Sequence, residues 1–117
     1  MTGVNTNMQP PLVFDLLKSI QWREQGPHSQ LLADNKAARL VLLTLRAGKE
    51  IKEHRNASQL FLQVIKGCIV LTAADQHVTL RPAMVCQLAA GLPHQLRAEQ
   101  DSVFLLTMIP GPTCREE

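Results

Sequence analysis

The sequence has few aromatic side chains and no cluster of positive charge. Only 3% of its residues are aromatic, and its 12 Lys and Arg residues are spread along the chain among 10 acidic ones. A nucleic-acid surface needs clustered basic residues or stacking aromatic rings, so we expect no nucleic-acid partner. The longest apolar runs, 40–45 (LVLLTL) and 103–109 (VFLLTMI), fall far short of the roughly 18 residues of a membrane helix. We therefore expect no membrane partner either.

The sequence also lacks the common motifs of catalysis and secretion. Its six glycines are scattered singly, which excludes a phosphate-binding loop, and no Ser or Cys occupies a recognisable nucleophile turn. A dyad of Cys86 and His94 is conceivable, but no third group is available to orient it. Residues 1–11 have neither the basic start nor the apolar core of a secretion signal. We expect a cytoplasmic protein with a flexible lead-in at 1–11.

The three cysteines, Cys68, Cys86 and Cys114, are odd in number and show no C-x-x-C spacing. This pattern favours small hydrophobic residues in a reducing compartment over disulfides or a zinc knuckle. Cys114, near the end of the chain, is expected to be the most exposed and the most reactive of the three.

What the sequence does contain is a series of short apolar segments, several rich in Val, Ile and Thr. They are 38–46, 60–66, 68–72, 77–81, 84–88 and 103–109. Turn-forming residues separate them, and this pattern is typical of an all-β sandwich or barrel. The length of 117 residues suits one domain, which we place at 12–110, with a frayed tail at 111–117.

The segment 38–46 is apolar on both faces of the predicted strand. Val41 and Leu43 would lie on one face, and Leu40 and Leu42 on the other. A strand of this kind is covered on both sides. One cover is the interior of the domain, and the other would be a second sheet or a partner subunit. We expect a homodimer, because the uncovered face would be a large apolar patch.

The region before the first of these segments is ambiguous. In 11–22 (PLVFDLLKSIQW), Val13, Leu16, Leu17 and Ile20 have helical spacing, which favours a short helix. An edge strand followed by one helical turn would also fit. We favour a strand that leads into a short helix.

Two sets of spaced residues resemble the paired signatures of small single-domain cupins. Five residues separate Gly48 from His54, and Gly67 closes the first signature at the expected distance. Gly91 and His94 have the spacing of the second signature. The resemblance covers about residues 38–109 and implies a double-sheet jelly-roll barrel, which usually forms dimers.

The sequence departs from the cupin signatures at two of the four positions that usually bind metal. Asn56 stands at the second histidine of the first signature and Leu60 at the glutamate, while Ala83, Ala89 and Ala98 replace other signature residues. Only His54 and His94 keep a ligand type. The chain is most similar to a subset of small cupins with one histidine in the first signature, the ending 63–67 (QVIKG) and the stretch 93–98 (PHQLRA). Members of that subset are mostly of undetermined function.

Two histidines alone make an incomplete metal site. A stable zinc site takes three or four protein ligands, and the facial iron site needs a carboxylate beside two histidines. Asn56 and Gln63 are candidate supporting amide ligands, although alternation places Gln63 on the opposite face from Leu60 unless a bulge intervenes. Otherwise His54 is a rim histidine, and His94 donates to a backbone carbonyl.

We expect an apolar cavity with His54 and His94 as its polar groups. The residues predicted to line it are Val41, Leu43, Leu60, Leu62, Val64 and Leu105. The predicted function is binding of a small, mostly apolar organic ligand, without catalysis or a required cofactor. The alternative is a metal-dependent oxygenase or isomerase that uses the two histidines to hold Zn, Fe, Mn or Ni.

Overall fold

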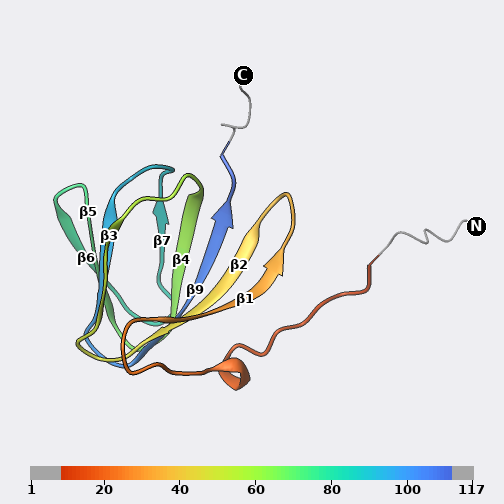
Figure 1. The fold of residues 1–117 in the computed structure, drawn as a ribbon, viewed down its shortest axis with the longest axis horizontal. Coiled ribbons are helices and arrows are strands. Elements are labelled where there is room, and N and C mark those ends of the chain that lie inside the picture. The colour runs from red at the N-terminus through yellow and green to blue at the C-terminus, as the bar shows by residue number, and fades with distance from the viewer. Residues whose placement is uncertain (1–8, 112–117) are drawn as a thin grey trace, which may run out of the picture.

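The computed structural model describes residues 9–111, which fold into two antiparallel β-sheets that face each other (Figure 1). The larger sheet has the strand order β1-β2-β9-β4-β7, and the smaller sheet the order β3-β8-β5-β6. The strands are β1 (His28–Asp34), β2 (Arg39–Leu45), β3 (Glu50–His54), β4 (Gln59–Lys66), β5 (Ile69–Ala73), β6 (Gln76–Leu80), β7 (Val85–Leu88), β8 (His94–Ala98) and β9 (Ser102–Ile109). The predicted all-β jelly-roll barrel is confirmed.

Each of the six predicted apolar segments forms a strand, at bounds within a residue or two of those expected. Three strands, β1, β3 and β8, were not predicted. The reason is clearest in β3, an edge strand in which every residue except Ile51 is exposed. The pattern of apolar segments does not indicate this strand, because only one of its five residues (EIKEH) is apolar.

The strand predicted in the N-terminal region is wrong. The described residues before His28 contain no strand, and one short 3-10 turn, η1 (Leu17–Ser19), confirms the helical turn. With η1 as the sole helical element of residues 9–111, no described helix is long enough to cross a membrane. Residues 1–8 of the predicted lead-in, residues 112–117 of the predicted tail and Cys114 lie outside the described residues.

The core lies between the two sheets and is built from their inward-facing side chains. Phe104, Val64 and Ile69 are each 0% exposed and come from β9, β4 and β5. Burial of a side chain of this size contributes about 1.5–3 kcal/mol to the stability of the fold. The core therefore ties the two sheets together at their centre.

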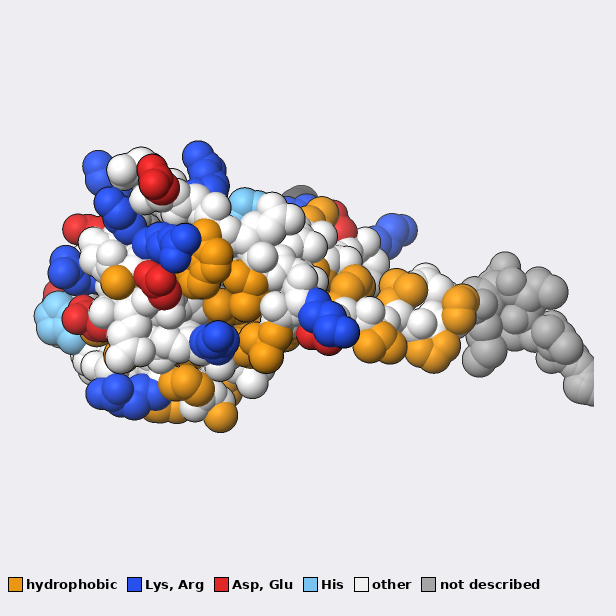
Figure 2. Space-filling model, turned by 90° about the horizontal axis from the view of Figure 1, so that it is seen from below, with side chains coloured by type: hydrophobic (Ala, Val, Ile, Leu, Met, Phe, Trp, Pro, Cys, Tyr) orange, Lys and Arg blue, Asp and Glu red, His pale blue; other side chains and the backbone are white. Residues whose placement is uncertain are grey.

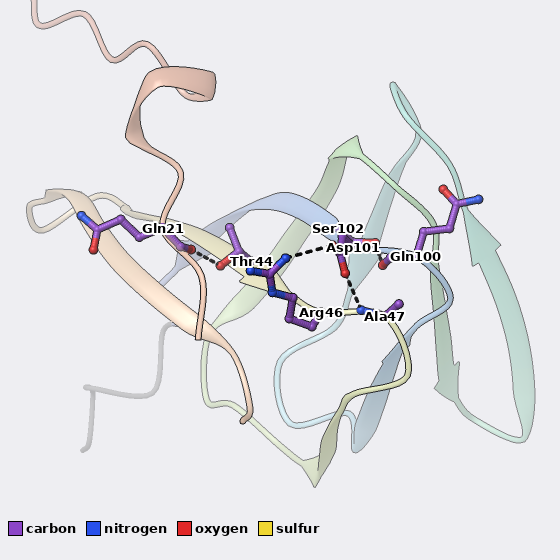
Figure 3. Close-up of polar contacts among 7 residues, drawn as sticks. All are labelled: Gln21, Thr44, Arg46, Ala47, Gln100, Asp101 and Ser102. Carbon is purple, nitrogen blue, oxygen red and sulfur yellow. Dashed lines mark hydrogen bonds and ion pairs between the residues drawn. The ribbon is translucent and has the colours of Figure 1, made fainter. Parts of the chain in front are cut away.

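The outer faces of the two sheets differ. On the larger sheet, the outward residues Leu42 and Val103 are only 2% and 1% exposed. Part of their cover is the chain's own N-terminal segment, since the Thr44 hydroxyl donates a hydrogen bond to the Gln21 carbonyl over this face (Figure 3). The outward residues of the smaller sheet, such as His77 and Gln95, are exposed and polar. The prediction of strands covered on both faces thus holds for β2.

Candidate functional site

A small cavity of about 160 Å³ lies inside the barrel, between the two sheets. Its lining is mostly apolar and includes three polar side chains. The lining residues are Pro27, Leu43, Ile51, His54, Asn56, Leu60, Leu62, His94, Leu96, Phe104 and Leu106. An apolar hollow with a few convergent polar groups has the general form of a small-molecule site.

His54 and His94 are direct neighbours in the smaller sheet. They face each other in the β3–β8 ladder, with ring centroids 4.4 Å apart and ring planes inclined by 58°. The predicted pair is therefore brought together side by side on one sheet, and not across the cavity from two sides. Both rings belong to the cavity lining.

A β-bulge puts His54 on the inner face. Between the pairs Ile51↔Leu96 and His54↔His94, β3 advances three residues while β8 advances two. Without that irregularity, Ile51 and His54 would point to opposite faces, because side chains alternate along a strand. The extra residue in β3 restores His54 to the side of Ile51, and bulges commonly re-aim side chains in this way.

Backbone carbonyl groups hold both imidazole rings in the same manner. His54 Nδ1 lies 3.0 Å from the Lys52 carbonyl oxygen, and His94 Nδ1 lies 3.0 Å from that of Leu92. A carbonyl oxygen only accepts, so Nδ1 of each ring carries the hydrogen and donates it. In the neutral rings, Nε2 then presents the lone pair, which can accept a hydrogen bond or bind a metal ion. His94 is buried at 4% exposure, whereas His54 lies at the rim.

Asn56 is the third polar residue of the cavity, and it makes hydrogen bonds to residues of two loops. Its side-chain oxygen accepts from the Ser58 amide at 2.8 Å, and its carbonyl oxygen accepts from the Gly91 amide at 2.7 Å. The second bond joins the loop after His54 to the loop before His94, which stabilises the placement of the pair. Asn56 is a poor additional metal ligand, because its neutral amide oxygen binds Fe²⁺ or Zn²⁺ weakly and already accepts one hydrogen bond.

The donor set does not fit a tight site for the metals that cupins commonly hold. Leu60, at the position of the cupin carboxylate, is apolar, 3% exposed and part of the lining. Gln63 is exposed and paired with Leu105 and Val85 on the outer face of the larger sheet, away from the histidines. Within residues 9–111, no group of three or more His, Cys, Asp or Glu side chains could hold a metal ion. Two imidazoles alone fall short of the usual three or four ligands.

The predicted lining residues divide between the two faces of the larger sheet. Leu43, Leu60 and Leu62 line the cavity, while Val64 is buried in the core on the same face of β4. Val41 packs against the core without reaching the cavity. The prediction that Leu105 lines the cavity is wrong. This residue lies on the outer face of β9, and its neighbours Phe104 and Leu106 line the cavity instead.

Five lining residues were not predicted: Pro27, Ile51, Leu96, Phe104 and Leu106. The spacing of Leu96 from His94 is a signal that could have found it, because residues two apart on a strand share a face.

Cys86 does not form a catalytic dyad with His94. Cys86 lies on β7 in the larger sheet and His94 on β8 in the smaller one, so the two strands are not paired with each other. Burial raises the pKa of the Cys86 thiol above its ordinary value, which keeps the thiol protonated and weakly nucleophilic.

Two facing antiparallel sheets, with a histidine from each signature turned into the space between them, define a cupin-type barrel. Comparison with solved structures confirms this fold. A cupin superfamily protein from Desulfitobacterium hafniense superimposes with a TM-score of 0.78 over 91% of this chain and 97% of its own, at 21% identity. An RmlC-like cupin from Desulfovibrio desulfuricans gives 0.79 over 86% and 98%, at 22% identity. A conserved protein of unknown function from Streptococcus pyogenes gives 0.77 over 97% and 98%, at 20% identity. No protein-family model and no curated protein matches the sequence.

Proposed function

We propose that this protein is a cytoplasmic binding module that holds one small, mostly apolar organic molecule in the barrel cavity without transforming it. The observation that carries the proposal is the composition of the cavity, in which eight apolar residues surround a space that His54, His94 and Asn56 reach from one side. The apolar walls would take the body of the ligand. Each Nε2 atom would accept a hydrogen bond from a ligand hydroxyl group or, when its ring is protonated, donate one to a ligand carboxylate.

The size of the cavity limits the ligand. A volume of about 160 Å³ is below the range of roughly 300–1,000 Å³ that holds drug-sized ligands. An apolar cavity of about 150 Å³ accommodates benzene. We therefore propose a ligand of about six to ten non-hydrogen atoms, such as a monocyclic aromatic acid or alcohol or a short fatty acid.

Ligand-observed NMR with benzoate, benzyl alcohol and hexanoate would test the proposal. We expect at least one of them to bind with a dissociation constant between about 1 μM and 1 mM, because so small a ligand makes few contacts. His54→Ala and His94→Ala should each weaken binding. His77→Ala is the matched control, since His77 is an exposed histidine bonded to Thr72 on the outside of the same sheet. Equal losses in all three variants, or no binding by any fragment, would contradict the proposal.

The alternative is a metal-dependent oxygenase or isomerase built on the histidine pair. The observation that favours it is that Nδ1 of each ring is bonded to a backbone carbonyl oxygen, which leaves both Nε2 atoms available to a metal, with the ring centroids 4.4 Å apart. Metal analysis of protein purified without an affinity tag separates the two functions. A stoichiometric metal that is lost in both His54→Ala and His94→Ala would favour the enzyme, and metal-free protein that still binds the fragments would favour the binding module.

A further inference from the structure

The chain before the barrel carries exposed apolar side chains that nothing in the described structure covers. Residues 9–17, here called the N-terminal arm, run away from the two sheets (Figure 1). Leu12 is 60% exposed, Val13 89%, Phe14 39% and Leu17 55%. Figure 2 shows hydrophobic side chains gathered along this projecting segment. The Cα radius of gyration is 16.3 Å, against about 13 Å for a compact chain of this length.

The arm projects from a fixed root. The Thr44 hydroxyl donates to the Gln21 carbonyl, and the Arg46 guanidinium lies 4.6 Å from the centre of the Trp22 ring. Farther out, Pro10 and Pro11 restrict the backbone to extended conformations. The arm is therefore held at one end and stiffened near the other, which favours its projection from its own barrel.

The surface that matches the arm is the outer face of the larger sheet. Two neighbouring rows of outward residues cross its strands and contain no charged side chain. They are Gln30, Leu42, Leu105, Gln63 and Val85 in one row, and Leu40, Thr107, Phe61 and Gln87 in the other. Val85 is 60% exposed. The outer face of the smaller sheet is polar and carries the facing pair of Glu50 and Arg97, so it does not suit an apolar segment.

The dimensions of the arm and the sheet agree. The part of the arm before the η1 turn, residues 9–15, spans about 23 Å when it is extended. Five strands spaced about 4.8 Å apart are about 19 Å wide from the first to the last. One arm can thus cross a whole sheet, and a two-fold axis would let each chain provide one arm and one sheet.

We propose that the N-terminal arm of each protomer docks on the outer face of the larger sheet of a second copy, so that two chains form a reciprocal, arm-exchanged homodimer. Leu12, Val13, Phe14 and Leu17 supply the apolar contacts on the arm. Leu40, Phe61 and Leu105 receive them on the sheet. The contact covers the arm together with the part of these rows that the chain's own N-terminal segment leaves accessible, which includes the half-buried Leu40, Phe61 and Leu105 and the exposed Val85.

Light scattering on the full chain over a range of concentrations tests the assembly. We expect about 26 kDa, twice the 13.0 kDa of one chain, and a dissociation constant at least tenfold higher for Val13→Asp. Val13 is so exposed that this change leaves the barrel intact, which circular dichroism would verify. Leu31→Asp is the matched control. Leu31 is 56% exposed, but it pairs with Val41 on the core side of the sheet and so lies off the proposed docking face. A monomeric wild type, or a dimer that Val13→Asp leaves unchanged, would overturn the proposal.

Cross-linking separates exchanged arms from arms that fold back on their own sheet. A photo-cross-linking benzoylphenylalanine replaces Phe14 in two preparations, one of them labelled with ¹⁵N, which are unfolded, mixed and refolded together. We expect mass spectrometry to find mixed-isotope cross-links between the arm and peptides of β2, β4 or β9. If every cross-link joined two peptides of the same isotope, the arm would lie on its own chain, and the proposal would be overturned. Neither experiment depends on a ligand in the cavity.

Discussion

At the scale of single residues, Leu60 has the largest consequence for chemistry, because it replaces the carboxylate of the cupin signature inside the cavity. We predict that Leu60→Glu completes a set of two histidines and one carboxylate and raises Zn²⁺ or Mn²⁺ affinity at least tenfold. The buried carboxyl group should lower the stability of the metal-free protein by about 1–3 kcal/mol. Isothermal titration calorimetry measures the affinity.

The control for this change is Leu62→Glu, which buries the same group in the same cavity two residues along β4. It should destabilise the protein similarly without the gain in affinity. Adding His94→Ala to Leu60→Glu should abolish the gain. If folded Leu60→Glu binds metal no better than Leu62→Glu does, residue 60 does not correspond to the ligand position.

Gln30 is a second residue of interest, because it is polar and its side-chain oxygen lies in a buried position. Its side-chain oxygen is buried and has no hydrogen-bond partner among the described residues. An unsatisfied buried acceptor costs about 1–3 kcal/mol, and an apolar group of similar shape avoids that cost. We predict that Gln30→Met raises the free energy of unfolding by about 1 kcal/mol. Urea denaturation at fixed protein concentration measures it, with the exposed Gln95→Met as a control expected to change little. A destabilised Gln30→Met would mean that the oxygen has a partner.

At the scale of elements, the turn between β4 and β5 shows why the first signature ends in glycine. Gly67 has φ +90°, and a Cβ atom there would collide with Ser102 and with the backbone of Asp101. The crowding neighbour is not a free side-chain end, since the Ser102 hydroxyl bonds to both the amide and the carbonyl of Cys68. The glycine lets β5 begin close beside the start of β9.

We predict that Gly67→Ala destabilises the protein by about 3 kcal/mol or more, because it combines a strained backbone with a collision. Gly48→Ala is the matched control. Gly48 also has a positive φ, +81°, but no atom lies within 4 Å of a Cβ built there. It should cost only about 1–2 kcal/mol of backbone strain. Thermal and urea unfolding of the two variants compare these costs, and equal losses would exclude crowding as the cause.

The elements also show what a sequence can and cannot reveal. Runs such as 60–66 are recognisable as strands because apolar residues dominate them. The face that each residue takes is harder to predict, and Leu105 shows this, since the residues on both sides of it in β9 are apolar as well. The inward direction of His54 depends on a bulge that exists only in the pairing of β3 with β8. No local pattern in β3 encodes that irregularity.

At the scale of the whole molecule, one acidic residue joins three parts of the chain that are distant in sequence. Asp101, between β8 and β9, accepts a hydrogen bond from the Ala47 amide at 2.8 Å and forms an ion pair with Arg46 at 3.0 Å (Figure 3). Arg46 in turn lies against Trp22 in the N-terminal segment. The same carboxylate therefore holds the turn between β2 and β3 and, through Arg46, the root of the N-terminal arm.

This arrangement predicts a loss of stability in acid. The hydrogen bond from the Ala47 amide, followed by that from Arg46, lowers the pKa of Asp101 below its ordinary value of 3.8. A carboxyl group whose pKa is lower in the folded state stabilises the protein above the unfolded-state pKa. That contribution is lost as the pH falls through the folded-state value. We therefore predict that Asp101→Asn is less stable than wild type at pH 7 and that the difference shrinks below about pH 4.

Urea unfolding at pH 7 and pH 3, followed by the fluorescence of Trp22, the single tryptophan, measures both the stability and the attachment of the N-terminal segment. At pH 7, Asp101→Asn should also shift the emission of folded protein, because Arg46 loses its partner and no longer lies fixed over the indole ring. Asp34→Asn is the matched control. Asp34 pairs with Arg39 at the other end of β2, at 3.3 Å, and makes no contact with this cluster. A difference between wild type and Asp101→Asn that stays constant from pH 7 to pH 3 would show that the charge of Asp101 does not hold these segments together.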